Sequence, residues 1–301
     1  MQDAAETVSL RLRLPNPDER RWITFEAPDR HILFSAAING KAVTVLLDNG
    51  ADRTLIDRGT ASRLALKIRG NGLAAVTSAM TTIETMATET VTIEIPRALR
   101  VEGPMVASNL APIARALGRP VDVVLGCEVL DEVAVMIDPS AKRMAFHTGA
   151  SARPEAGTTR VPIDDGGMVS ATLNGPSVRL KLDLGFNGVV RLSENAWRRS
   201  VRDGVPTGTG SQTTADGRTR MTSSVLAALR IGAVNVPRAT VLDGYVPAGN
   251  ADGLLGTGFL ARGPIILDLK GRQLLLLPPQ ARQASRSWVP ARSKAETISP
   301  R

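Results

Sequence analysis

Short runs of alternating apolar and polar residues recur along most of the chain, and clusters of Gly, Pro, Asn and Asp separate them. Alternation with a period of two is typical of β-strands that bury one face. The pattern therefore predicts a mostly β chain. The alternating segment from Leu10 to Leu14 suits a strand at the edge of a sheet.

Two segments share nearly the same hairpin pattern. In the first, Asn39-Gly40 separates two apolar runs, and the second run ends in Asp48-Asn49-Gly50. In the second, Asn174-Gly175 has the same role, and the following run ends in Asp183-Leu184-Gly185. An Asn-Gly pair favours a tight hairpin turn, because both residues readily adopt positive φ. The pattern predicts two hairpins, each ending in an Asp-x-Gly turn.

The similarity between the two halves continues downstream. Val123-Val124-Leu125-Gly126 in the first half corresponds to Gly253-Leu254-Leu255-Gly256 in the second, and Ile137-Asp138 corresponds to Leu267-Asp268. Several features recur in the same order, so we interpret the chain as two copies of one unit.

Three short helices are also expected. Asp57 should cap one that runs through Ala65, and Ser193 should cap another that runs through Val201. A third is expected over the apolar segment Leu110 to Leu117.

The two Asp-x-Gly turns are the candidate chemistry. Each places an Asp at the end of an apolar strand, and the Gly two residues later allows a sharp turn. If the copies meet at a pseudo-twofold axis, Asp48 and Asp183 lie side by side. Two adjacent carboxylates do not both ionise readily and share one proton. Such a pair can activate a water by general acid–base catalysis, and it titrates as a unit, so neither residue receives a fixed role.

The segment Asp48–Ile56 resembles the active-site motif of retropepsins, the retroviral-type aspartic proteases. Val123–Gly126 is similar to the segment that packs beside the catalytic turn in that family. The layout resembles bacterial proteins with two retropepsin-like units in one chain, many of them exported. The resemblance implies an all-β fold of two similar pepsin/retropepsin-like β-barrel lobes, related by a pseudo-twofold axis and with few short helices.

The resemblance also implies the site residues. Asp48 and Asp183 are the expected catalytic pair. The residues expected to support the two turns are Asn49, Gly50, Ala51, Leu184, Gly185, Gly126 and Gly256.

The chain departs from the family pattern next to each aspartate. In the family, a Thr or Ser after the Asp bonds to the opposite lobe through its hydroxyl. We expect Asn49 to replace that bond imperfectly and Leu184 not to replace it. Two hairpins that would close over a substrate are expected at Ala75–Ala87 and Gln212–Met221.

The expected organisation has five parts. They are an N-terminal extension with an edge strand over residues 1–30, a first lobe over 31–148, a linker over 149–160, a second lobe over 161–278 and a basic tail over 279–301. The tail has few apolar residues and many basic ones, a composition typical of disorder.

Composition narrows the range of binding partners that the sequence predicts. The net charge is +8, but aromatic residues make up only 3% of the chain, so no basic and aromatic surface for nucleic acid is expected. No apolar run is long enough to span a membrane, and no signal peptide is seen. The family resemblance nevertheless favours a periplasmic or secreted protein. We expect a monomer whose two lobes pair within one chain.

Other chemistry is less favoured by the sequence. His31 and His147 are not spaced as zinc ligands, and we expect no metal or cofactor. Cys127 is the only cysteine, which excludes an intrachain disulfide. It could act as a nucleophile with His147, but a small buried residue is the favoured interpretation.

Two functions remain open from the sequence. The first is an aspartic endopeptidase that cuts a peptide or protein substrate with a water activated between two aspartates in the interlobe cleft. The alternative is a catalytically inactive aspartic-protease-like protein that binds extended peptides or a partner protein. A variant of the first function is an enzyme that is active only when a further partner or a dimer orders the two hairpins over the site.

Overall fold

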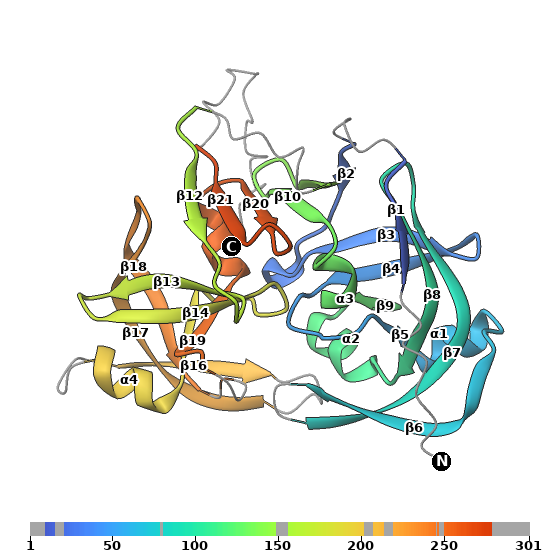
Figure 1. The fold of residues 1–301 in the computed structure, drawn as a ribbon. Helices are drawn as coiled ribbons and strands as arrows, with labels where there is room; N and C mark the ends of the chain where they lie inside the picture. The colour runs from blue at the N-terminus through green and yellow to red at the C-terminus, as the bar shows by residue number, and fades with distance from the viewer. Residues whose placement is uncertain are drawn as a thin grey trace, which may run out of the picture.

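The computed structural model describes residues 10–15, 21–78, 81–148, 156–201, 207–213, 219–244, 246 and 250–278, and within 70–84 and at 212–213 it describes the backbone alone. Strands make up 52% of the structure, which confirms the mostly β prediction. Two barrel lobes lie beside each other, and a third sheet joins them (Figure 1).

The first lobe is a barrel closed by strands in the order β8-β5-β9-β4-β3-β7, because β7 also pairs with β8. Its first hairpin turns at Asn39 and Gly40, whose φ angles are 48° and 80°. Two further strands, β1 and β6, extend the sheet beyond the closed ring. The strands are β1 (Arg11–Arg13), β3 (Leu33–Ile38), β4 (Lys41–Leu47), β5 (Leu55–Asp57), β6 (Ile68–Ser78), β7 (Thr81–Ile95), β8 (Leu99–Ser108) and β9 (Val123–Leu125).

The second lobe repeats this topology. Its ring has the order β13-β14-β19-β15-β18-β17 and closes through pairing of β13 with β17. The expected fold of two barrel lobes is therefore confirmed. The strands are β13 (Met168–Leu173), β14 (Ser177–Asp183), β15 (Val190–Leu192), β16 (Gly208–Thr213), β17 (Thr219–Ile231), β18 (Val234–Asp243) and β19 (Gly253–Gly256).

A six-stranded sheet joins the lobes, in the order β12-β21-β20-β10-β11-β2. At its centre β10 from the first half pairs antiparallel with β20 from the second, with Met136 opposite Ile266. Both side chains are buried in a small core on this sheet. The strands are β2 (Ile23–Thr24), β10 (Ala134–Asp138), β11 (Arg143–His147), β12 (Thr159–Pro162), β20 (Ile265–Asp268) and β21 (Gln273–Leu276).

The three predicted helices are present. Asp57 accepts a hydrogen bond from the Thr60 N–H at the start of the first, and Ser193 accepts one from the Ala196 N–H at the start of the last. Among the described residues, three short helical turns were not predicted, and two of them directly follow Gly126 and Gly256. The helices are η1 (Pro28–Arg30), α1 (Arg58–Arg63), α2 (Ala111–Leu117), α3 (Cys127–Leu130), α4 (Glu194–Ser200) and η3 (Thr257–Arg262).

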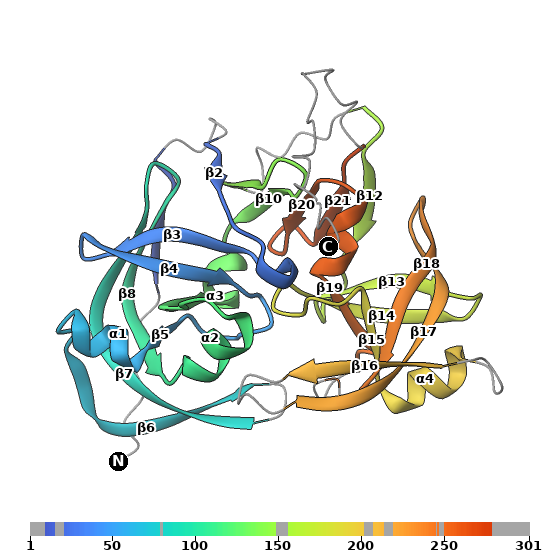
Figure 2. The ribbon, with the colours of Figure 1, turned by 180° about the vertical axis from the view of Figure 1, so that it is seen from behind.

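Two long hairpins leave the lobes on the side away from the joining sheet. The β6–β7 hairpin of the first lobe and the β16–β17 hairpin of the second point toward each other in both views (Figures 1 and 2). The expected flap segments Ala75–Ala87 and Gln212–Met221 fall on these hairpins. Their tips at 79–80 and 214–218 lie outside the described residues, as do 149–155 of the expected linker and the tail 279–301.

No helix in the described part of the chain combines the length and the apolar character that crossing a membrane requires.

Candidate active site

Asp48 directly follows β4, where parallel pairing with β9 ends at Leu47 and Leu125. Its backbone N–H donates to the Leu125 carbonyl at 3.1 Å, which anchors the start of the turn. Its Oδ1 accepts a hydrogen bond from the Gly50 N–H at 2.8 Å. The buried apolar strand thus fixes the backbone, and the turn fixes the carboxylate.

Asp183 occupies the corresponding position in the second lobe. It is the last residue of β14 and lies opposite Gly256 of β19. Its Oδ1 accepts a hydrogen bond from the Gly185 N–H at 2.9 Å, the same contact that Asp48 makes with the Gly two residues after it.

The two carboxylates meet at the boundary between the lobes. A Cβ added to Gly50 would lie 2.7 Å from Oδ1 of Asp183, and a Cβ added to Gly185 would overlap both oxygens of Asp48. Each turn glycine therefore lies against the carboxylate of the opposite lobe, where only glycine leaves enough room. This reciprocal contact brings Asp48 and Asp183 together.

Asn49 ties the two turns to each other. Its Nδ2 donates to the Leu182 carbonyl at 2.9 Å, and its Oδ1 accepts from the Leu184 N–H at 2.8 Å. The side chain is 3% exposed. The amide thus makes two hydrogen bonds across the lobes, where only an imperfect replacement was expected. Leu184 is buried and returns no side-chain hydrogen bond, so the link is one-sided, as its residue type requires.

Gly126 and Gly256 support the turns from behind. The residue after each of them donates its N–H to the turn: Cys127 to the Ala51 carbonyl at 2.7 Å, and Thr257 to the Phe186 carbonyl at 2.8 Å. A Cβ added to Gly126 would lie 2.5 Å from the backbone of Arg53. The glycines therefore allow a close backbone approach that holds each Asp-x-Gly turn in place.

A second contact between the lobes was missed by sequence reasoning. Arg30 Nη1 donates to the Asn187 carbonyl at 3.1 Å, and His31 Nε2 hydrogen-bonds to the Gly185 carbonyl at 3.2 Å. Asn187 also donates to the Asp29 carboxylate. The turn that carries Asp183 is thus held by η1 and the residue after it. The short polar run Asp29-Arg30-His31 was the available signal, but nothing local indicates its partner.

Burial and mutual repulsion set the charge of the dyad. Burial raises the pKa of Asp48, the negative charge of Asp183 raises it further, and backbone N–H groups oppose this, giving a pKa of about 7. Burial also raises the pKa of Asp183 above its ordinary value, while the Gly185 N–H, Arg191 and Lys181 oppose the rise. Near neutral pH the pair can therefore hold one proton and one negative charge.

Residues 34–129 match the family described as aspartyl protease. This segment of the chain is therefore similar to aspartyl proteases. The matched segment contains Asp48 and Gly126 but ends before the second lobe, so the likeness of that lobe rests on its strand order and its turn. Among curated proteins, none matches this chain.

The described part of the chain has a pocket of about 570 Å³ beside the turn that carries Asp48. Both lobes line it, with Asn49 and Cys127 from the first and Lys181 and Leu182 from the second. Neither Asp48 nor Asp183 lines this pocket, so it lies next to the dyad rather than over it.

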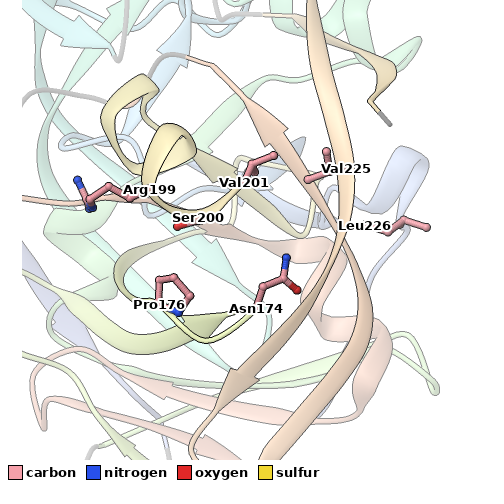
Figure 3. Close-up of a pocket in the computed structure, with 7 residues that line it drawn as sticks. All are labelled: Asn174, Pro176, Arg199, Ser200, Val201, Val225 and Leu226. Carbon is pink, nitrogen blue, oxygen red and sulfur yellow. The ribbon is translucent and has the colours of Figure 1, made fainter. Parts of the chain in front are cut away.

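A second pocket of about 380 Å³ lies on the second lobe, between α4, the β13–β14 turn and β17 (Figure 3). It also contains neither aspartate. Its lining residues are Asn174, Pro176, Arg199, Ser200, Val201, Val225 and Leu226.

The surroundings of Cys127 do not favour its action as a nucleophile. Burial raises the pKa of the Cys127 thiol to about 12, and its Sγ donates to the Asn49 carbonyl at 3.0 Å. A thiol with so high a pKa is protonated at neutral pH and is a poor nucleophile. Within the described residues, no cluster of three or more His, Cys, Asp or Glu side chains is arranged to hold a metal.

Proposed function

We propose that this protein is an aspartic endopeptidase that hydrolyses peptide bonds with a water activated between Asp48 and Asp183. The observation that carries the proposal is the reciprocal packing of Gly50 and Gly185 against the opposite carboxylates. It supports a dyad formed by the two lobes of one chain, with a peptide or protein as substrate.

In the proposed reaction, the ionised carboxylate takes a proton from the water while the protonated carboxyl gives its proton to the carbonyl oxygen of the scissile bond. The water oxygen bonds to the carbonyl carbon and forms a tetrahedral diol. As the diol collapses, one of its hydroxyls gives a proton to the carboxylate that is now ionised, the C–N bond breaks, and the other carboxyl gives its proton to the nitrogen. The dyad therefore again holds one proton. Neither a covalent intermediate nor a cofactor is needed.

The rigidity of the turns supports this chemistry. A catalytic pair works only when its groups are held close to the productive geometry. Here the backbone N–H groups of the turns fix the carboxylates, and the Asn49 amide holds the two turns together across the lobes.

The test is digestion of a peptide library by the purified chain from acidic to neutral pH, read by mass spectrometry. We expect cleavage by the wild type and by Asp165→Asn, a control on an exposed turn, and none by Asp48→Asn or Asp183→Asn. A wild type that binds peptides from the library without cutting any of them would overturn the proposal. That result would instead support a peptide-binding protein, the function that the buried Leu184 favours.

A further inference from the structure

The strand positions beside Asp48 in the first barrel carry apolar side chains. In the strand register, Leu46 of β4 lies opposite Val124 of β9, and Val124 lies opposite Leu55 of β5. Residues in register on neighbouring strands place their side chains on the same face of the sheet. These three side chains form one buried cluster, and Ile113 and Leu117 of α2 pack against it.

The equivalent register positions on the three neighbouring strands of the second barrel carry two basic side chains. Lys181 of β14 lies opposite Leu254 of β19, and Leu254 lies opposite Arg191 of β15. Because the two barrels share their strand order, Lys181 corresponds to Leu46 and Arg191 corresponds to Leu55. The two lobes therefore differ in charge at equivalent positions near the dyad.

Arg191 is held by an aromatic ring. Its guanidinium carbon lies 4.2 Å from the centre of the Phe186 ring, and its Nε is buried without a hydrogen-bond partner. Phe186 belongs to the turn of Asp183, since its N–H donates to the Asp183 carbonyl at 3.3 Å. A cation–π contact of this kind positions the positive charge without neutralising it. Arg191 is thus fixed beside the turn with its charge available to Asp183.

The difference in charge between the lobes affects the pKa values of the two aspartates differently. Burial lowers the pKa of Arg191 to about 10 and the charge of Asp183 opposes this, so the guanidinium remains charged at neutral pH. Arg191 and Lys181 both lower the pKa of Asp183 against the effect of burial. For Asp48, the largest opposing influences are backbone N–H groups, and the charge of Asp183 raises its pKa.

We propose that Arg191, assisted by Lys181, divides the two roles of the dyad. It holds Asp183 as the carboxylate that accepts the proton from water, and so leaves the shared proton on Asp48, which gives it to the substrate carbonyl. Arg191 acts through Asp183 and is a positioning residue. This division of roles rests on the proposed peptidase function.

The other charged groups around Arg191 are few in the described part of the chain. β19, its neighbour on one side, is made of Gly253, Leu254, Leu255 and Gly256. β18, its neighbour on the other side, ends in Asp243, which lies opposite Leu192 rather than Arg191. Lys181 of β14 also acts on Asp131 and Cys127 of the first lobe. Asp183 is the charged group with a direct influence on the pKa of Arg191.

A titration that does not require catalysis tests the assignment. The carboxyl carbons of Asp48 and Asp183 can be followed by ¹³C NMR in the full chain and assigned with the two Asn variants. We expect Asp183 to lose its proton at a lower pH than Asp48. In Arg191→Leu, which places the residue type of the first lobe at this position, the Asp183 transition should rise by about one pH unit.

Three further variants complete the test. Arg191→Lys should preserve the titration order, and Arg198→Leu, an exposed arginine on α4, should leave both transitions unchanged. Lys181→Leu should move the Asp183 transition in the same direction by a smaller amount, and it provides the test if Arg191→Leu does not fold. Asp48 titrating first in the wild type, or an Asp183 transition that stays in place when the cation is removed, would overturn the proposal.

The pH profile of kcat/KM provides the second readout. Ionised Asp183 is needed for activity, so Arg191→Leu should move the acidic limb to higher pH. A purely structural role would lower activity at every pH without moving the limb. If the wild type cuts no peptide, the proposed function fails, while the NMR titration still decides whether Arg191 sets the order of ionisation.

Discussion

At the scale of the residue, the Asn49 side chain carries the link between the two turns. Its amide satisfies the Leu182 carbonyl and the Leu184 N–H, which are both buried in the lobe boundary. An amide has a donor and an acceptor on one rigid plane, so a single side chain can make both bonds. The sequence predicted that Asn49 would replace the family's hydroxyl imperfectly, but its amide is well suited to this position.

Asn49→Leu should destabilise the protein, because it leaves a buried N–H and a buried carbonyl without partners. The expected loss in the free energy of unfolding is about 2 to 4 kcal/mol. Denaturant unfolding measures it, with Asn195→Leu at an exposed position on α4 as the control. An unfolding midpoint that equals the wild-type value would show that the amide does not hold the lobes.

Asp48→Asn should stabilise the fold at neutral pH. The pKa of Asp48 rises from 3.8 to about 7 on folding, so the neutral form is favoured in the folded state. Its contribution to stability is complete below 3.8 and is lost as the pH rises through about 7. Above pH 7 this shift corresponds to about 4 kcal/mol, which is the most that the variant should gain.

Thermal unfolding from acidic to neutral pH checks whether Asp48 lowers the stability of the fold as the pH rises. The wild-type melting temperature should fall as the pH rises toward neutrality, and the Asn variant should show a flatter dependence. A variant that is less stable than the wild type at neutral pH would contradict the repulsion between the carboxylates.

At the scale of the element, local signals predicted the hairpins and the helix caps well. Asn39-Gly40 takes the positive φ values of a tight turn, and Asp57 and Ser193 cap the helices expected of them. Each of these features depends on a few neighbouring residues. Other features depend on partners far along the chain, which sequence patterns do not indicate. These are the hydrogen bonds from Arg30 and His31 to the Asp183 turn, and the packing of Arg191 on Phe186.

The close approach at Gly126 gives a test at this scale. Gly126→Ala would place its Cβ against the Arg53 backbone and should cost several kcal/mol or prevent folding, because backbone atoms cannot move aside easily. Gly40→Ala is the matched comparison, since nothing lies near its Cβ and only the positive φ is unfavourable, at about 1 kcal/mol. Equal losses in the two variants would contradict the packing of the turn.

At the scale of the whole molecule, one chain supplies both halves of the site. The repeat predicted two similar lobes, and their closed barrels share one strand order. The joining sheet was not predicted, because its pairing of β10 with β20 connects strands from opposite halves. The expected monomer remains a prediction.

If one chain suffices, specific activity should not change with protein concentration. Both aspartates and the Asn49 link come from the same chain, so dilution removes nothing from the site. Initial rates measured over a wide dilution series check this, alongside the mass in solution by light scattering. A specific activity that falls steeply on dilution would show that a second copy completes the site.

The central claim is that Asp48 and Asp183 act as one catalytic unit. Its most direct measurement is kcat/KM for Asp48→Asn, Asp183→Asn and the double variant on one peptide that the wild type cleaves. Residues that act as a unit give strongly non-additive losses. We expect each single variant to be as inactive as the double. A single variant that retains clear activity above the double would contradict the account.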